Sequence, residues 1–197
     1  MVNEAARSGM QKLNKKFKII DHYDDYQRYL DPDKRNELSW FGYCMQCAAQ
    51  SDMATQIDLL TRVVLAQIMH LNAPNWIIKH DDKDFPWIQN EAIRNAFLQQ
   101  FKVLLEGNGI ATNEVGPLLV SQKELCAVLN ELIYYPQNLS YKNIDLIPVG
   151  SEVVIKLTHH LDIQLISRNK VILDELLQFA EGVEGLTYME LRNEQSF

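Results

Sequence analysis

The sequence predicts an α+β protein: a mostly helical N-terminal two thirds packed with a small antiparallel sheet of about three or four strands and one helix at the C-terminus. Up to residue 136, apolar residues recur three and four positions apart, which is typical of helices. After residue 140 they alternate with polar residues, which is typical of a half-buried strand. No linker or repeat divides the chain, which favours one domain over residues 21–197, helical at 21–136 and sheet-containing at 140–197.

The helices are predicted from apolar spacing and from residues that cap helix ends. Ser121 and Glu124 have the spacing of a capping box, so the helix that follows them is the best specified. The pairs Asp31-Pro32 and Ser51-Asp52 are further start signals. The predicted helices span residues 21–30, 32–50, 53–71, 88–106 and 122–135, and the charged residues 79–86 are predicted to be a connection.

The sheet is predicted from the alternation in residues 153–165, where the apolar residues occupy the odd positions. Thirteen residues suit either one long strand or a hairpin that turns near Thr158-His159-His160. A shorter strand is expected at 143–148, a helix at 169–181, and a last strand from Leu186 to Leu191.

Composition and charge bound the class of protein. The 197 residues are 47% hydrophobic and 23% charged, which is typical of a folded chain. The net charge is −7, but residues 1–20 hold five basic residues against Glu4 alone, so the remainder carries −11. An acidic body argues against nucleic-acid binding, because that affinity comes mainly from neutralising phosphates. Residues 1–20 are predicted to be a basic, partly disordered arm that could contact an acidic partner, anionic lipid or the protein's own acidic surface.

The expected location is the cytoplasm. The N-terminus lacks the apolar core of a signal peptide, and no run of 18 uncharged apolar residues suggests a membrane span. Three cysteines are too few for a disulfide framework. Cys44 and Cys47 have the spacing of a redox or zinc motif, but the predicted helix 32–50 surrounds them with apolar residues and offers no second ligand pair. They are therefore predicted to pack as small apolar residues.

Two clusters are candidates for chemistry. The cluster of His80, Asp81, Asp82 and Asp84 contains an adjacent His-Asp pair that resembles the central pair of the HD-type phosphohydrolases. This resemblance implies, as an alternative function, a metal-dependent hydrolase with His70 as an upstream ligand and Asp145 as a late one.

The second cluster is His159, His160 and Asp162. In a continuous strand, His160 and Asp162 would share a face, so that the carboxylate could orient the imidazole as general-base pairs require. No nucleophile in a recognisable motif accompanies them.

We therefore expect a non-enzymatic cytoplasmic adaptor, chaperone-like protein or subunit of a multiprotein assembly, which binds another protein or peptide segment through apolar helical surface or a sheet edge. The aromatic candidates for this contact are Trp40, Tyr43, Trp87, Tyr134 and Tyr135. No catalytic, metal-binding or cofactor-binding residues are predicted. In its size and acidity the chain resembles the small acidic chaperones of bacterial secretion systems, and this resemblance implies a role as a secretion chaperone or adaptor.

Overall fold

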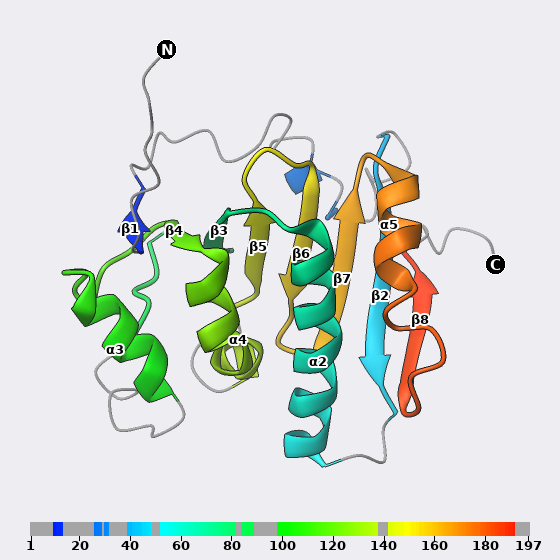
Figure 1. Ribbon diagram of the computed structural model, residues 1–197, viewed down its shortest axis with the longest axis horizontal. Coiled ribbons are helices and arrows are strands. Elements are labelled where there is room, and N and C mark those ends of the chain that lie inside the picture. The colour runs from blue at the N-terminus through cyan, green and yellow to red at the C-terminus, as the bar shows by residue number, and fades with distance from the viewer. Residues whose placement is uncertain are drawn as a thin grey trace.

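A computed structural model describes residues 10–13, 26–28, 30–31, 39–48, 52–81, 84–88, 98–137 and 142–191. Within these ranges the strands form one eight-stranded antiparallel sheet in the order β1-β4-β3-β5-β6-β7-β2-β8, with helices α2 to α5 on one face (Figure 1). The strands are β1 (Gln11–Lys12), β2 (Phe41–Cys47), β3 (Asn75–His80), β4 (Leu118–Ser121), β5 (Ile144–Pro148), β6 (Val153–Leu157), β7 (Asp162–Ser167) and β8 (Leu186–Glu190). The helices are α2 (Met53–Leu71), α3 (Gln99–Gly107), α4 (Gln122–Tyr135) and α5 (Lys170–Leu177).

The predicted fold class was wrong: the sheet has eight strands, of which β2, β3 and β4 come from residues 21–136, expected to be helical, and β1 comes from residues 1–20, expected to be a partly disordered arm. The largest error is β2, which replaces the middle of the predicted helix 32–50; residues 32–38 lie outside the described residues. This strand pairs on both sides, with β7 and with β8, and both of its faces meet apolar or small side chains. A strand of this kind has no period-2 alternation and cannot be told from a buried helix by its pattern.

Other predicted elements also differ from the structure or lie partly outside the described residues. Strand β3 is buried at four of its six positions, and it includes Lys79 and His80, which were predicted to lie in a connection. Strand β4 was not predicted. The predicted helix 88–106 is helical over 99–107 only; residues 89–97 lie outside the described residues. Of the predicted helix 21–30, residues 26–28 are helical and most of the others are not described.

Where local signals are strong, the predictions are confirmed. Helix α2 has the predicted bounds, and its N-cap Asp52 accepts a hydrogen bond from the Thr55 amide. Helix α4 also has the predicted bounds, with both hydrogen bonds of the capping box present between Ser121 and Glu124. The region 153–165 is a hairpin formed by β6 and β7. The predicted strands before and after it correspond to β5 and β8, and the predicted helix 169–181 is shortened to α5.

The sheet separates two apolar layers. On the helix face, side chains of α2, α4 and α5 pack on alternate residues of the central strands, including Trp76, Met45 and Ile155. On the opposite face, Tyr26 and Trp40 are buried against Ile77, Ile147, Val154 and Ile166. The same alternation decides where each polar side chain of the sheet points.

Candidate functional site

The outer edge of β8 is the most distinctive surface of the molecule. β8 is the last strand of the sheet and pairs with β2 alone among the described strands (Figure 1). The Leu191 amide donates to the Gly42 carbonyl at one end, and the Ala48 amide donates to the Gly185 carbonyl at the other. Antiparallel pairing alternates, so residues 187 and 189 also face β2, whereas residues 186, 188 and 190 point their backbone groups outward.

Tyr188 lies at the centre of this outer edge. Its amide and carbonyl face away from β2, and within the described part of the chain no backbone group bonds to them. The Leu186 amide is held by the Val183 carbonyl in the preceding turn, while the Leu186 carbonyl points outward. The edge therefore presents the Leu186 carbonyl, the Tyr188 amide and the Tyr188 carbonyl in a row. This order of acceptor, donor and acceptor is the pattern that an added strand needs.

The side chains of β8 differ between its two faces. On the helix face, Tyr188 packs edge-on against Tyr43 and donates a hydrogen bond to Glu181 at 3.4 Å. On the opposite face lie Thr187 and Met189, both uncharged. Tyr188 is 44% exposed and Met189 is 51% exposed, so an added strand would meet apolar surface on both faces.

Acidic residues gather near this edge. Residues 170–191 contain five carboxylates against one basic residue, Lys170. The ammonium group of Lys170 is already held by the Asp174 carboxylate at 3.0 Å and by the Tyr43 hydroxyl. The surroundings of β8 are therefore negatively charged and favour cationic ligands.

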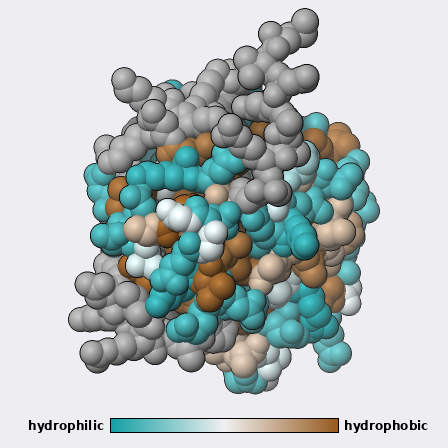
Figure 2. Space-filling model, turned by 60° about the vertical axis from the view of Figure 1, so that its left-hand side comes forward, coloured by the Kyte–Doolittle hydropathy of each residue, from teal (hydrophilic) through white to brown (hydrophobic). Residues whose placement is uncertain are grey.

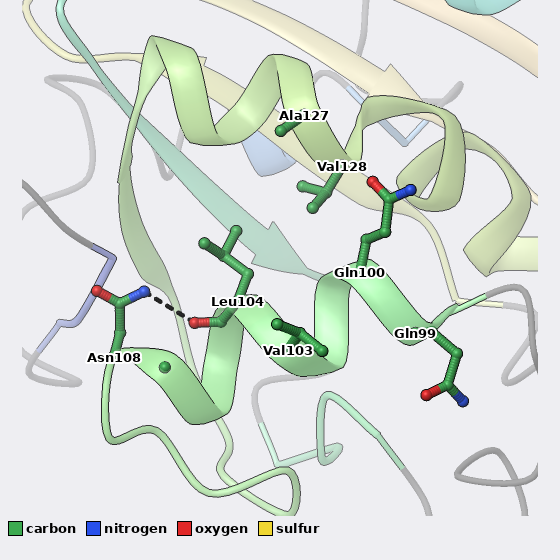
Figure 3. Close-up of a pocket in the computed structure, with 8 residues that line it drawn as sticks. Gln99, Gln100, Val103, Leu104, Asn108, Ala127 and Val128 are labelled. Carbon is green, nitrogen blue, oxygen red and sulfur yellow. Dashed lines mark hydrogen bonds between the residues drawn. The ribbon is translucent and has the colours of Figure 1, made fainter.

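A second surface feature is an apolar groove of about 430 Å³ between α3 and α4 (Figure 3). Val103 and Leu104 of α3 face Ala127 and Val128 of α4 across it. Figure 2 brings the α3 side of the molecule forward and shows apolar areas interrupted by hydrophilic residues. The residues that line the groove carry no charge, so it can accept an apolar group but offers little that would select one.

The groove is held in shape by a buried carboxylate. Helix α3 has no side-chain cap of its own, and Glu131 of α4 accepts hydrogen bonds from the amides of Gln100 and Phe101, at 3.1 and 2.7 Å. These amides are among the donors that a helix start leaves without intrahelical partners. The contact therefore fixes α3 against α4 through a helix cap provided by a residue thirty positions away.

A buried ionic cluster lies on the opposite face of the sheet. The Lys156 ammonium group is 2.7 Å from the Asp145 carboxylate and 2.8 Å from the Asp81 carboxylate, and the Tyr26 hydroxyl donates to Asp145 at 2.9 Å. Burial by itself lowers the pKa of Lys156, but the charges and hydrogen bonds of the two carboxylates outweigh it, so the pKa lies above its ordinary value. A lysine that stays protonated is not a nucleophile, which favours a structural role.

A polar pocket of about 470 Å³ lies over this cluster. Its polar lining residues are Gln27, Asp31, Asp81, Asn143, Lys156 and Gln164. The pocket brings together two residues that the sequence pointed to, Asp81 and, through Lys156, Asp145. Asp81 and Asp145 meet at the Lys156 ammonium group, and not at a metal ion held by histidine.

His80 and Asp81 diverge because they are consecutive residues at the end of a strand. His80 points to the helix face, where its Nε2 lies 3.1 Å from the Tyr135 hydroxyl, and that hydroxyl donates to the Trp87 carbonyl. Asp81 turns to Lys156 on the other face. Within the described residues, no group of three or more His, Cys, Asp or Glu side chains is placed to hold a metal ion. The geometry therefore gives the HD-like alternative no support.

The second candidate cluster is also separated by the backbone. His159 and His160 lie in the turn between β6 and β7, and Asp162 begins β7. Between them Leu161 adopts a left-handed φ of 54°, so His160 and Asp162 do not continue one strand. His159 instead makes two contacts to the side-chain oxygen of Asn143, from its backbone amide and from its ring.

Three of the five aromatic candidates for partner binding are buried within this chain. Trp40 packs on Tyr26 in the layer opposite the helices, while Trp87 and Tyr135 contact each other in the main core. Tyr43 and Tyr134 are half-buried. Tyr43 lies beside Tyr188, so it is the candidate that the fold brings to the edge at β8. Tyr188 and Met189 were not among the predicted contact residues, although a strand was predicted there, because no local pattern shows which strand lies at the end of a sheet.

Cys44 and Cys47 point to opposite faces of β2, since residues three apart in a strand never share a face. The prediction that they lie in a helix was wrong. Burial, with a further contribution from the Asp162 carboxylate, raises the pKa of Cys44 to about 12. Burial also raises the pKa of Cys47 and of Cys126.

We therefore expect the native thiols to react slowly. With a pKa of about 12, roughly one Cys44 in 10⁵ is a thiolate at neutral pH. An aromatic disulfide reagent should label Cys44 in folded protein at least about a hundredfold more slowly than in urea-unfolded protein, where all three cysteines react. Peptide mapping of the labelled protein assigns each site. Fast labelling of Cys44 in the folded state would show that β2 does not bury it.

Comparison with protein-family models, with curated proteins and with solved structures finds no match for this chain. In the described part of the chain, no helix is both long enough and apolar enough to span a membrane.

Proposed function

We propose that this protein is a non-enzymatic cytoplasmic adaptor or chaperone-like protein that holds another polypeptide by accepting one of its segments as a strand along β8. The observation that carries the proposal is the row of outward-facing backbone groups around Tyr188. Unpaired edges pair readily with other chains, so sheet proteins usually protect them with proline, lysine, a bulge or a very short strand.

β8 has none of these protections, and its one charged side chain, Glu190, lies at its C-terminal end. Its sequence, Leu-Thr-Tyr-Met-Glu, contains no proline or lysine, and its register with β2 runs without a bulge over all five residues. At the other end of the sheet, β1 is only two residues long. The contrast between the two edges supports a role for β8 in binding, because an edge without a function is normally the one that is shortened or covered.

The proposal is tested by a substitution that removes only the outward-facing donor. Proline at position 188 has no amide hydrogen, and the Tyr188 amide does not bond to β2, so Tyr188→Pro should block strand addition while leaving the β2–β8 pairing intact. Tyr188→Thr is the matched control, since it removes the ring but keeps the amide. Thermal unfolding of both variants shows whether the fold is kept.

Tagged protein is expressed in its native host and its bound polypeptides are compared. We expect a defined partner, in about 1:1 amount, with wild type, a smaller amount with Tyr188→Thr because the ring is lost, and at least about tenfold less with folded Tyr188→Pro than with Tyr188→Thr. The proposal fails if no partner is bound, or if the same partner is retained equally by all three proteins. If Tyr188→Pro does not fold, Met189→Lys, which adds a charge on the exposed side of the edge, takes its place.

A further inference from the structure

We infer that the segment bound at β8 alternates basic residues on the helix side with apolar residues on the opposite side. This inference rests on the proposed function and adds the chemistry of the partner. It follows from how the charges near β8 are divided between the two faces of the sheet.

The helix face of the edge is acidic. Glu190 shares this face with Tyr188, because both pair with odd-numbered residues of β2, and Glu181 accepts the hydrogen bond of the Tyr188 hydroxyl. Asp174 of α5, which accepts a hydrogen bond from the Tyr43 hydroxyl, adds a third carboxylate on this side, whereas Glu175 lies 3.3 Å from His70 of α2. Lysine or arginine residues of an added strand would therefore lie beside carboxylates and beside the Tyr188 ring, which also attracts cations.

The opposite face of the edge carries no charge on β8 itself; the Asp162 carboxylate on this face lies two strands further in, on β7, beside Cys44. The edge presents Thr187 and the exposed Met189 here, with Cys44 and Gln46 of β2 behind them and Leu191 beyond the strand. Apolar residues of an added strand would cover Met189 on this side. Successive side chains of a strand point to opposite faces, so an added strand that suits both faces alternates basic and apolar residues.

A second copy of this chain fits the edge less well. Pairing two β8 strands in antiparallel fashion would bring together two helix faces that both carry Glu181 and Glu190. The carboxylates of the two copies would then repel one another, because like charges repel. The division of charge thus favours a different, basic partner over self-association.

Three capped eight-residue peptides test the inference. In the first, lysine and valine alternate; in the second, glutamate replaces each lysine; the third has the composition of the first but groups the residues in pairs, so that no face is uniform. Binding is measured by calorimetry at low and high salt. We expect the alternating basic peptide to bind at least about tenfold more tightly than either of the others, with an affinity that falls as salt screens the charges.

Charge reversal on the protein provides the matched control. The double variant Glu181→Lys/Glu190→Lys should prefer the glutamate peptide, and Tyr188→Pro should weaken binding of every peptide. If the acidic and basic peptides bind equally and Tyr188→Pro abolishes both, the inference is overturned while strand addition stands. If no peptide binds but the native partner still depends on the Tyr188 amide, the inference alone fails. Concentration-dependent dimers abolished by Tyr188→Pro would overturn it in favour of a second copy.

Discussion

Replacing Lys156 with methionine is expected to lower the free energy of unfolding by about 3–5 kcal/mol, because the fully buried Asp145 carboxylate loses the ammonium group that neutralises it. Urea unfolding followed by circular dichroism measures this change. The pKa of Lys156 in the folded protein lies above its ordinary value of 10.5, so the stabilisation is fully present below about pH 10.5 and is lost as the pH rises through the folded value. The decrease in the free energy of unfolding caused by Lys156→Met should therefore be the same at about pH 7 and pH 9.

Two variants serve as controls for Lys156→Met. Lys170→Met breaks an exposed pair with Asp174 and should change stability little, since exposed ion pairs contribute little. The double variant Lys156→Met/Asp145→Asn removes both charges and keeps an acceptor for the Tyr26 hydroxyl, so it should recover at least about half of the loss. A single Lys156→Met variant as stable as wild type would mean that the buried cluster is not an ion pair in the folded protein.

The variant Trp87→Ala is expected to lower the free energy of unfolding by a similar amount, about 3–5 kcal/mol. The indole is fully buried, packs against the rings of His80, Phe101 and Tyr135, and donates a hydrogen bond to the Gly116 carbonyl at 2.8 Å. Truncation leaves a cavity and removes a partner of that carbonyl. Denaturant unfolding measures the loss, and Trp87→Phe, which keeps part of the ring volume, should lose less.

The variant Trp87→Phe also tests which aromatic candidates belong to the core and which to the binding surface. Because Trp87 lies in the main core, folded Trp87→Phe should bind the partner as wild type does. Tyr43, beside Tyr188, is the candidate whose replacement by alanine should weaken binding. A Trp87→Phe variant that keeps its stability but loses the partner would place Trp87 in the binding surface and contradict this assignment.

The parts of the fold that could be predicted are those set by local interactions. The Ser121–Glu124 capping box and the Asp52 cap depend on residues within one turn. Strands β6 and β7 are neighbours along the chain and pair as a hairpin, although β6 is buried at all five positions and not on one face only. β2 could not be predicted, because its partners β7 and β8 lie more than a hundred positions later in the chain. Tertiary context decides the state of such an apolar run, whose pattern fits either helix or strand.

The candidate site has the same dependence on long-range order. A strand from Leu186 to Leu191 was predicted and corresponds to β8, but its place at the end of the sheet follows from β2, which was not predicted. The Lys156 cluster likewise needs β3, β5 and β6 side by side before Asp81 and Asp145 meet one lysine. Pairs that adjoin in sequence, such as His80 and Asp81, were instead separated by the strand geometry.

Amide hydrogen exchange of Tyr188 tests the central proposal most directly. The amides of Thr187 and Met189 face β2, whereas the Tyr188 amide faces outward and should exchange fast in the free protein. If β8 accepts a strand, the bound partner should slow exchange at Tyr188 by at least about tenfold and change its two neighbours much less. A partner that binds at full occupancy, leaves Tyr188 unchanged and protects other residues, such as those of the α3–α4 groove, would contradict the proposal.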